Sequence, residues 1–353
     1  MNPSNPAVRQ IIQNFIDCGS IAGALFLAAD GERVRSLDCA GYANLAARRP
    51  LTPDALFWVA SMTKPLTATA FMLLADEGRA GLGDAVEYYL PEFGQLLIRT
   101  PRGELRPPKH PVTISELLSH TSGLPFSSPA ELPTLDLHPL AVTATSYARE
   151  RLCFEPGEGY LYSNEDINTV GRVIELVSGK SYADFLRERL LDPLGMTDTT
   201  FWPDAAQLAR LATAYQPAPD RRLVETRITQ MHYPLGDRAA RHAFPAGGIF
   251  STAADFLSFS QMLLNGGVHR GRRIISEAAI RELSARHSPP TVNEAYGLGF
   301  NLGPGWFGHG GAYSTQFCVH PARQVVTVYL IQQAGWVSGD PAANLNVTLT
   351  AAL

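Results

Sequence analysis

Ser61 and Lys64 have the residue types and the spacing of a nucleophile with its base. A separation of three residues is almost one helical turn, so the hydroxyl and the amine project from the same face of a helix. A serine hydroxyl becomes a good nucleophile only when a base takes its proton. A lysine is such a base when burial or neighbouring cations lower its pKa. An isolated match is more often a capping serine beside a solvated lysine, so the rest of the chain has to support the chemistry.

The surrounding residues predict a helix that begins near Ser61 and ends at Gly78, with apolar side chains at helical spacing between them. Pro65 falls in the first turn, where a missing N–H costs least. The residue before a proline is normally pushed away from α geometry. Lys64 must therefore be held in the helix by its surroundings, which is consistent with a buried site.

Two later stretches offer the groups that a serine–lysine pair needs. Tyr162 and Asn164 follow a turn rich in proline and glycine, and we expect them to point the same way in an extended segment. A tyrosine beside a cation is expected to ionise more easily and to shuttle a proton, and an asparagine can hold both the lysine and a substrate amide. The second stretch, 306–313, contains His309, Gly310 and Gly311. Its glycines allow a substrate to approach the strand closely, so that an exposed N–H can stabilise an oxyanion.

The elements that must position these residues form a β–helical–β arrangement. An amphipathic helix over 8–18 precedes a hairpin, whose strands we place at 21–29 and 33–40 around the turn Asp30-Gly31. The middle of the chain is rich in predicted helices, and strands return near the end. The sequence therefore predicts an α+β fold in which strands from both ends pair into one antiparallel sheet with helices on its faces. The predicted helices lie at 143–152, 167–178, 182–191, 253–264 and 276–285, the strands at 296–302, 314–320 and 324–332, and a last helix begins at Asp340 or Asn344.

Composition excludes several functional classes. The chain has 353 residues and a formal net charge of −4, with no basic stripe, so nucleic acid is not an expected partner. No apolar run is long enough to cross a membrane. The N-terminus lacks the pattern of a signal peptide, which predicts a cytoplasmic protein, or a periplasmic or secreted one if a leader has been removed. The four cysteines show no metal-binding spacing, and we expect buried free thiols.

The order of Ser61-x-x-Lys64, Tyr162-x-Asn164 and His309-x-Gly311 resembles that of the serine β-lactamase and penicillin-binding-protein superfamily. The resemblance covers nearly the whole chain. It is closest to the branch of class C β-lactamases, D-alanyl-D-alanine carboxypeptidases and family VIII carboxylesterases. It implies a single catalytic domain over 1–353 with an α/β lobe, about 1–78 plus 240–353, and an all-helical lobe at 79–239.

The same resemblance implies a mechanism. Ser61 attacks a carbonyl and forms an acyl-enzyme, while Lys64 and Tyr162 handle the proton. The N–H groups of Ser61 and Ala312 form the oxyanion hole, and Asn164, His309, Gly310 and Gly311 bind the substrate. Neither a metal nor an organic cofactor is implied. The expected partner is a small acyl substrate, and the sequence leaves the oligomeric state open.

Two departures from the family pattern bear on the substrate. The third motif usually carries a lysine and a hydroxyl that hold the substrate carboxylate, whereas this chain has His309 and Gly311. A histidine that is mostly neutral at pH 7 binds a carboxylate less well. A role in which His309 only orients Tyr162 also stays open. Glu165 and Asp166 follow the second motif; we interpret them as a solvated helix start, with an amine-binding Glu165 in the cleft as the sharper hypothesis.

These features favour an esterase for short-chain or neutral acyl esters, with weak β-lactamase activity as a side reaction. A D-amino-acid peptidase or amidase, a true β-lactamase, and an acyltransferase that uses the same acyl-enzyme remain open alternatives. We interpret His120 as structural, because Lys64 and Tyr162 already supply the base. Six aromatic residues are candidates for the wall of an acyl pocket: Trp58, Phe126, Tyr160, Trp306, Tyr313 and Trp336.

Overall fold

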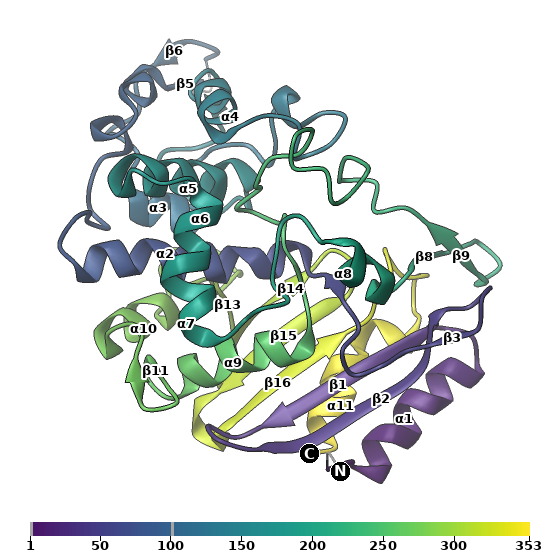
Figure 1. The fold of residues 1–353 in the computed structure, drawn as a ribbon. Coiled ribbons are helices and arrows are strands. Elements are labelled where there is room, and N and C mark those ends of the chain that lie inside the picture. Colours follow the sequence, from purple (N-terminus) through teal and green to yellow (C-terminus); the bar gives the residue numbers. More distant parts are fainter. Residues whose placement is uncertain (1–2, 100–101) are drawn as a thin grey trace.

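A computed structural model describes residues 3–99 and 102–353. Its centre is a seven-stranded antiparallel sheet in the order β13-β14-β15-β16-β1-β2-β3, so strands from the two ends of the chain lie side by side (Figure 1). The central pair is β1 with β16, in which Phe26 lies opposite Tyr329. The strands are β1 Gly23–Ala29, β2 Val34–Asn44, β3 Arg49–Pro50, β13 Asn301–Gly303, β14 Trp306–Gly311, β15 Thr315–His320 and β16 Val325–Leu330.

Both faces of this sheet are covered, which explains why every residue of β1 is buried. On one face Phe26 packs with the terminal helices α1 (Pro6–Asp17) and α11 (Leu345–Ala351). On the other face Leu25 and Leu27 belong to the main core with α9 (Ala253–Leu264). Alternate side chains of one strand therefore enter two different apolar clusters.

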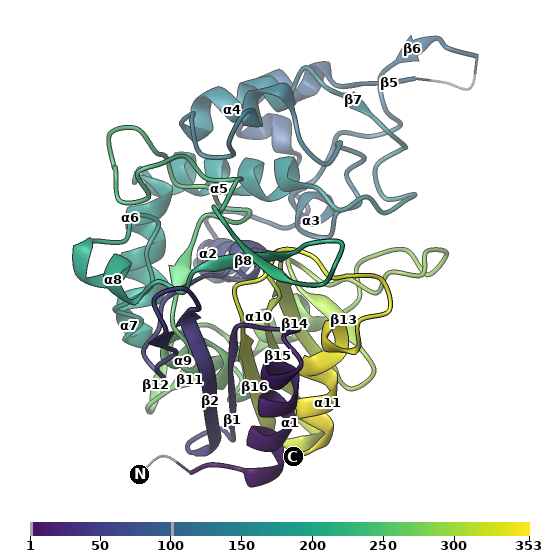
Figure 2. The ribbon, with the colours of Figure 1, turned by 90° about the vertical axis from the view of Figure 1, so that its right-hand side faces the viewer.

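The helix α2 (Thr63–Asp76) lies between the sheet and a group of helices from the middle of the chain (Figures 1 and 2). Its residues from Thr63 to Leu74 are all buried, because it packs against both parts of the molecule. The helices of this group include α3 Ile114–Leu118, α4 Leu140–Tyr147, α5 Asn164–Ser178 and α6 Tyr182–Leu186, of which α5 and α6 contact α2. The α+β arrangement with an antiparallel sheet agrees with the fold predicted from the sequence.

Shorter elements complete the chain. The strand β4, which precedes α2, pairs with β10. The strand β8 pairs with β9 and β11 with β12, while β5 pairs with both β6 and β7. The remaining helices and strands are β4 Phe57–Trp58, β5 Leu97–Arg99, β6 Leu105–Arg106, β7 Arg151–Leu152, α7 Asp192–Leu194, α8 Ala205–Arg210, β8 Ala214–Pro217, β9 Leu223–Thr226, β10 Phe250–Ser251, β11 Val268–His269, β12 Arg272–Arg273 and α10 Glu277–Ser284.

Several predicted boundaries are wrong, and three of them have a clear physical reason. The helix expected over 143–152 ends at Tyr147, because residues 151–152 pair with β5. The helix expected to stop at 191 continues through a π-helical turn into α7, where Pro193 is tolerated in the first turn. The strand expected over 296–302 is reduced to β13, because residues 297–300 form a turn. Gly299 permits this turn with a φ of +75°, and an added Cβ there would lie 2.6 Å from the Ala68 side chain of α2.

The cysteines are free, but the expectation that they are buried holds only for Cys318. Cys18 and Cys153 are exposed, and Cys39 is partly exposed. Within residues 3–99 and 102–353, none of the helices has both the length and the apolar character needed to cross a membrane.

Candidate active site

Ser61 lies in a short 3₁₀ turn, Ala60–Met62, that connects β4 to α2. The α-helix thus begins two residues later than the sequence predicts. Ala60 has a φ of +47°, in the left-handed region that costs a non-glycine residue free energy. The turn is held by the carbonyl of Val59, which accepts hydrogen bonds from Met62 N at 3.1 Å and Thr315 Oγ1 at 3.2 Å. The strained backbone at Ala60 is therefore held in place by the hydrogen bond from Thr315 on β15, and Ser61 faces the cavity.

Lys64, the second residue of α2, is completely buried, and its side-chain nitrogen has three partners. Nζ lies 3.4 Å from Ser61 Oγ, 2.9 Å from Asn164 Oδ1 and 2.7 Å from the carbonyl oxygen of Ala246. Burial lowers the pKa of this amine to about 7, although the charge of Glu131 acts in the opposite direction. The spacing argument therefore holds in three dimensions, and much of Lys64 is neutral near pH 7.

The loop that receives the Lys64 amine is itself fixed from several sides. Asn168 Oδ1 on α5 accepts a hydrogen bond from Ala246 N at 3.0 Å. Trp58 Nε1 donates to the carbonyl of Gly247 at 2.8 Å, and Thr67 Oγ1 donates to the carbonyl of Pro245 at 2.8 Å. The carbonyl of Ala246 is thereby positioned before it binds the amine.

Tyr162 lies just before α5, and its ring centroid is 4.6 Å from Lys64 Nζ. Burial raises the pKa of its phenol above the usual range, although a hydrogen bond with the Ser61 hydroxyl acts in the opposite direction. The expectation that Tyr162 ionises more easily is therefore wrong, because loss of solvent outweighs the hydrogen bond with Ser61. Asn164 is also not in an extended segment; it is the first residue of α5.

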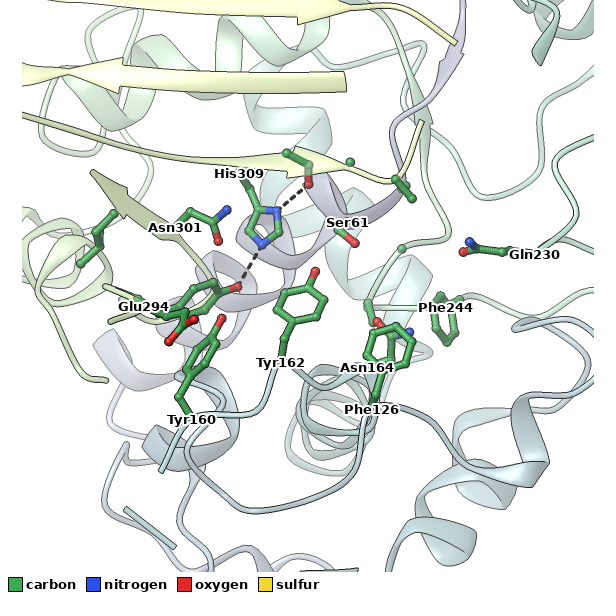
Figure 3. A pocket seen from close by; sticks show the side chains of 18 of the residues that line it. Ser61, Phe126, Tyr160, Tyr162, Asn164, Gln230, Phe244, Glu294, Asn301 and His309 are labelled. Atoms are coloured by element: carbon green, nitrogen blue, oxygen red, sulfur yellow. Dashed lines mark hydrogen bonds between the residues drawn. The ribbon is translucent and has the colours of Figure 1, made fainter. Parts of the chain in front are cut away.

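His309 on β14 is buried, and partners occupy both of its ring nitrogens. Nδ1 lies 2.7 Å from the carbonyl of Gly310, and Nε2 lies 3.0 Å from the hydroxyl of Tyr296 (Figure 3). A carbonyl only accepts, so we assign the proton to Nδ1, and Nε2 accepts from the tyrosine. Burial, followed by the charge of Lys64, lowers the pKa of His309 to about 3. The ring is therefore neutral and has no free donor for a substrate carboxylate.

The end of β14 passes directly beside the turn that carries Ser61. A Cβ added to Gly311 would lie 2.3 Å from the carbonyl oxygen of Val59, so only glycine allows this approach. Ser61, Gly310, Gly311 and Ala312 all line the same cavity. This places the segment expected to supply the second oxyanion donor next to the nucleophile.

The cavity has a volume of about 760 Å³, and Ser61 and Tyr162 lie at its centre (Figure 3). On one side of them lie Phe126, Asn164, Gln230 and Phe244, and on the other lie Tyr160, Glu294, Asn301 and His309. All of the sequence-predicted site residues except Lys64 contribute to its wall, and Lys64 lies beneath it.

Four of the six aromatic candidates line the cavity, namely Trp58, Phe126, Tyr160 and Trp306. Tyr313 does not; it is buried behind Trp58, with ring centroids 5.0 Å apart. Trp336 packs against the cluster that contains α1 and α11. Sequence reasoning missed Tyr296 and Glu294, because it assigned Tyr296 to a strand and gave no role to the preceding loop.

Glu165 and Asp166 contradict the interpretation of a solvated helix start. Both side chains are completely buried in α5. Burial raises the pKa of Glu165 to about 10, so its carboxyl group is protonated near pH 7, and burial also raises the pKa of Asp166 well above its usual range. Glu165 is not among the residues that line the cavity, so the alternative of an amine-binding Glu165 is also wrong.

His120 has a structural role beneath the tyrosine. Its Nδ1 accepts a hydrogen bond from Ser163 N at 3.3 Å and lies 2.9 Å from Asp166 Oδ2. Burial raises the pKa of Asp166 and lowers that of His120, which disfavours a charged pair between them. The ring centroid of His120 lies 4.6 Å from that of Tyr162. His120 therefore supports the ring of the proton carrier.

The burial of Lys64 predicts how activity depends on pH. If the neutral amine is the base, kcat/KM for an ester falls about tenfold per pH unit below pH 7 and is level above it. The midpoint belongs jointly to Lys64 and Glu131, because the Glu131 carboxyl also has a pKa raised to about 7. Glu131→Gln removes a charge that favours protonated Lys64 and should move the midpoint to lower pH. A flat profile between pH 5 and 8 contradicts this assignment.

The burial of Glu165 predicts a dependence of stability on pH. An unfolded glutamate releases its proton near pH 4.3, whereas the folded chain holds it to about pH 10. Between these values the folded state binds the extra proton, so its stability decreases as the pH rises. Glu165→Gln should therefore raise the unfolding free energy by about 1–3 kcal/mol at pH 8 relative to wild type. The gain should shrink towards pH 5, as measured by urea unfolding.

The control for this measurement is Glu158→Gln, because the Glu158 side chain is 56% exposed. It should show no difference between pH 5 and pH 8. An equal effect of Glu165→Gln at both pH values would mean that Glu165 is ionised in the folded protein.

Comparisons with known proteins agree with this geometry. A family model described as Beta-lactamase matches residues 8–352. Protein Rv1367c of Mycobacterium tuberculosis is 30% identical, over 94% of this chain and 91% of that protein. The lovastatin esterase of Penicillium rubens is 27% identical over 95% of each chain. The solved structure of EstCE1, described as a hydrolase with promiscuous acyltransferase activity, has a TM-score of 0.81 at 24% identity and covers 98% of this chain and 97% of its own. The expected fold is confirmed.

Proposed function

Because the chain belongs to the β-lactamase family, we propose that this β-lactamase-like serine hydrolase is a carboxylesterase for short-chain, neutral acyl esters. Family membership confirms the superfamily and the serine-hydrolase class expected from the ordered motifs of Ser61, Tyr162 and His309. The choice of esters goes further and depends on the third motif.

The observation that carries this choice is the absence of an anion-binding group. Both nitrogens of His309 are engaged within the protein, and the ring is neutral. Among the described residues that line the cavity, none is a lysine or an arginine. A substrate carboxylate would enter this cavity without a charge-assisted hydrogen bond from its wall, at a loss of about 1.5–3 kcal/mol. Neutral esters do not incur this loss. The lovastatin esterase, at 27% identity, supports the same class by its name.

The geometry supports the following sequence of steps. Neutral Lys64 accepts the proton of the Ser61 hydroxyl as Ser61 Oγ attacks the ester carbonyl. The N–H groups of Ser61 and Ala312 stabilise the oxyanion. Tyr162, whose phenol is protonated, donates a proton to the departing alcohol oxygen and is reprotonated from Lys64. Water then attacks the acyl-enzyme, and the same groups act in reverse.

A panel of three chromogenic substrates tests the proposal. We expect the wild type to hydrolyse p-nitrophenyl butyrate with a higher kcat/KM than nitrocefin or a D-alanyl p-nitroanilide. The lactam and the anilide represent the β-lactamase and peptidase alternatives. Faster turnover of nitrocefin than of the ester would overturn the assignment, and so would a preference for the anilide.

A further inference from the structure

Glu294 is a charged group in the cavity for which the mechanism above has no use. It is the only aspartate, glutamate, lysine or arginine among the described residues that line the cavity. Its residue is exposed, and no ion pair of its carboxylate is present within the described part of the chain. The charge is therefore free to act on whatever enters.

The loop that carries Glu294 is fixed by hydrogen bonds. Ser288 Oγ donates to the carbonyl of Glu294 at 2.6 Å and accepts from Tyr296 N at 3.0 Å. Arg286 is the cation nearest in sequence, but its guanidinium donates to three carbonyls of the same loop, and Arg286 does not line the cavity. These hydrogen bonds fix the backbone at Glu294, while the arginine of the same loop is engaged elsewhere.

Aromatic rings surround the carboxylate. Tyr160 and Tyr296 line the same part of the cavity with ring centroids 5.7 Å apart, and Trp306 also contributes to the wall. Glu294 and Tyr160 lie side by side, across Tyr162 from Phe126 and Gln230 (Figure 3). Burial, and to a lesser extent the negative charge of Glu294, raises the pKa of the Tyr160 phenol. The electrostatic field of Glu294 therefore acts within the cavity. Carboxylates and aromatic faces together attract cations, and ammonium groups above all.

We propose that Glu294, with the partly exposed ring of Tyr160, forms a subsite for an ammonium group of the substrate. This inference rests on the ester hydrolysis proposed above and names its substrate class. The substrates are esters that carry no charge next to the reacting carbonyl but have a cationic amine at a distance from it. The sequence suggested Glu165 on α5 as an amine-binding residue. In this proposal Glu294, in the loop before β13, has that role instead.

Matched pairs of substrates test the subsite. Acetylthiocholine and 3,3-dimethylbutyl thioacetate differ only in the charge of the leaving group. The p-nitrophenyl esters of 4-(trimethylammonio)butyrate and 5,5-dimethylhexanoate differ only in the charge of the acyl group. We expect the wild type to favour the cationic member of at least one pair by about tenfold in kcat/KM, as an ion pair combined with a cation–π contact implies. The pair that responds identifies which part of the ester carries the ammonium group.

Glu294→Gln should reduce this preference to near unity and leave the neutral substrates unchanged. Glu32→Gln, which removes an equal charge from the exposed turn between β1 and β2, should retain it. Raising the salt concentration should weaken the preference in the wild type but not in Glu294→Gln. Equal turnover within both pairs, or a preference that survives Glu294→Gln, would overturn the subsite and leave the esterase assignment intact. No turnover of any of the four esters would overturn the esterase assignment and the subsite with it.

Discussion

Ser61→Ala is expected to reduce the turnover of p-nitrophenyl butyrate by roughly 10⁴-fold or more. The variant keeps Lys64, Tyr162 and the oxyanion donors but cannot form the acyl-enzyme. The remaining groups provide only positioning and electrostatic stabilisation for attack by water. One measurement is kcat/KM. The other is the mass of the protein after it has reacted with a slowly hydrolysed ester and the reaction has been rapidly quenched. Wild type should gain the mass of one acyl group, and the variant should gain none.

The control for this variant is Ser20→Ala, which removes a hydroxyl from the loop after α1, on the face of the sheet opposite the main core. It should retain full activity. The thermal midpoint of Ser61→Ala should stay within a few degrees of wild type, because the hydroxyl is not part of the apolar core. Retention of activity or of acylation in Ser61→Ala would discard the nucleophile.

Asp136→Ala is expected to lower the unfolding free energy by about 3–5 kcal/mol. Asp136 and Arg241 form a buried ion pair, with Asp136 Oδ2 2.5 Å from Arg241 Nε and side chains that are 0% and 1% exposed. Asp136 Oδ1 also accepts a hydrogen bond from His232 N at 2.9 Å. Loss of the carboxylate leaves the guanidinium buried without its counter-charge. Leu135, next to Asp136, and Gln230 both line the cavity, and Leu135 N donates to the carbonyl of Gln230 at 2.9 Å. The Asp136–Arg241 ion pair therefore also fixes one wall of the cavity.

Chemical denaturation of single and double variants separates the charge from the packing. The double variant Asp136→Leu with Arg241→Met should be more stable than Asp136→Ala alone, because it leaves no unpaired charge. Asp220→Ala removes one member of an exposed pair with Arg222 and should leave the denaturation midpoint unchanged. A similar midpoint for Asp136→Ala and wild type would show that Arg241 finds another partner or reaches solvent.

The catalytic centre could be predicted from the sequence to the extent that it depends on local spacing. The three-residue interval of Ser61 and Lys64 fixes their relative positions within one helical turn, and the structure places their reactive atoms 3.4 Å apart. The apolar runs near the two ends of the chain likewise predicted strands from local pattern, and these strands are present. In these cases short-range geometry decides where a side chain points.

Properties that depend on distant parts of the chain could not be predicted. Glu165 and Asp166 have the composition of a solvated helix start, but α5 packs against α2, α3 and α4, and this burial raises the pKa of both carboxyl groups. Tyr162 was expected to be acidified by its neighbouring cation, and burial has the opposite effect. Desolvation depends on everything packed around a group, and no local pattern encodes it.

The sequence by itself identified the candidate nucleophile Ser61, its candidate base Lys64, the order of the motifs and the histidine that replaces the usual carboxylate-binding lysine at position 309. Only the tertiary structure decided that both nitrogens of His309 are engaged, that the pKa of Lys64 is near 7, and that Glu294 enters the same cavity. The physical reason is that bond geometry along a helix or strand acts over a few residues, whereas burial, charge and partnership are set where residues far apart in the chain meet.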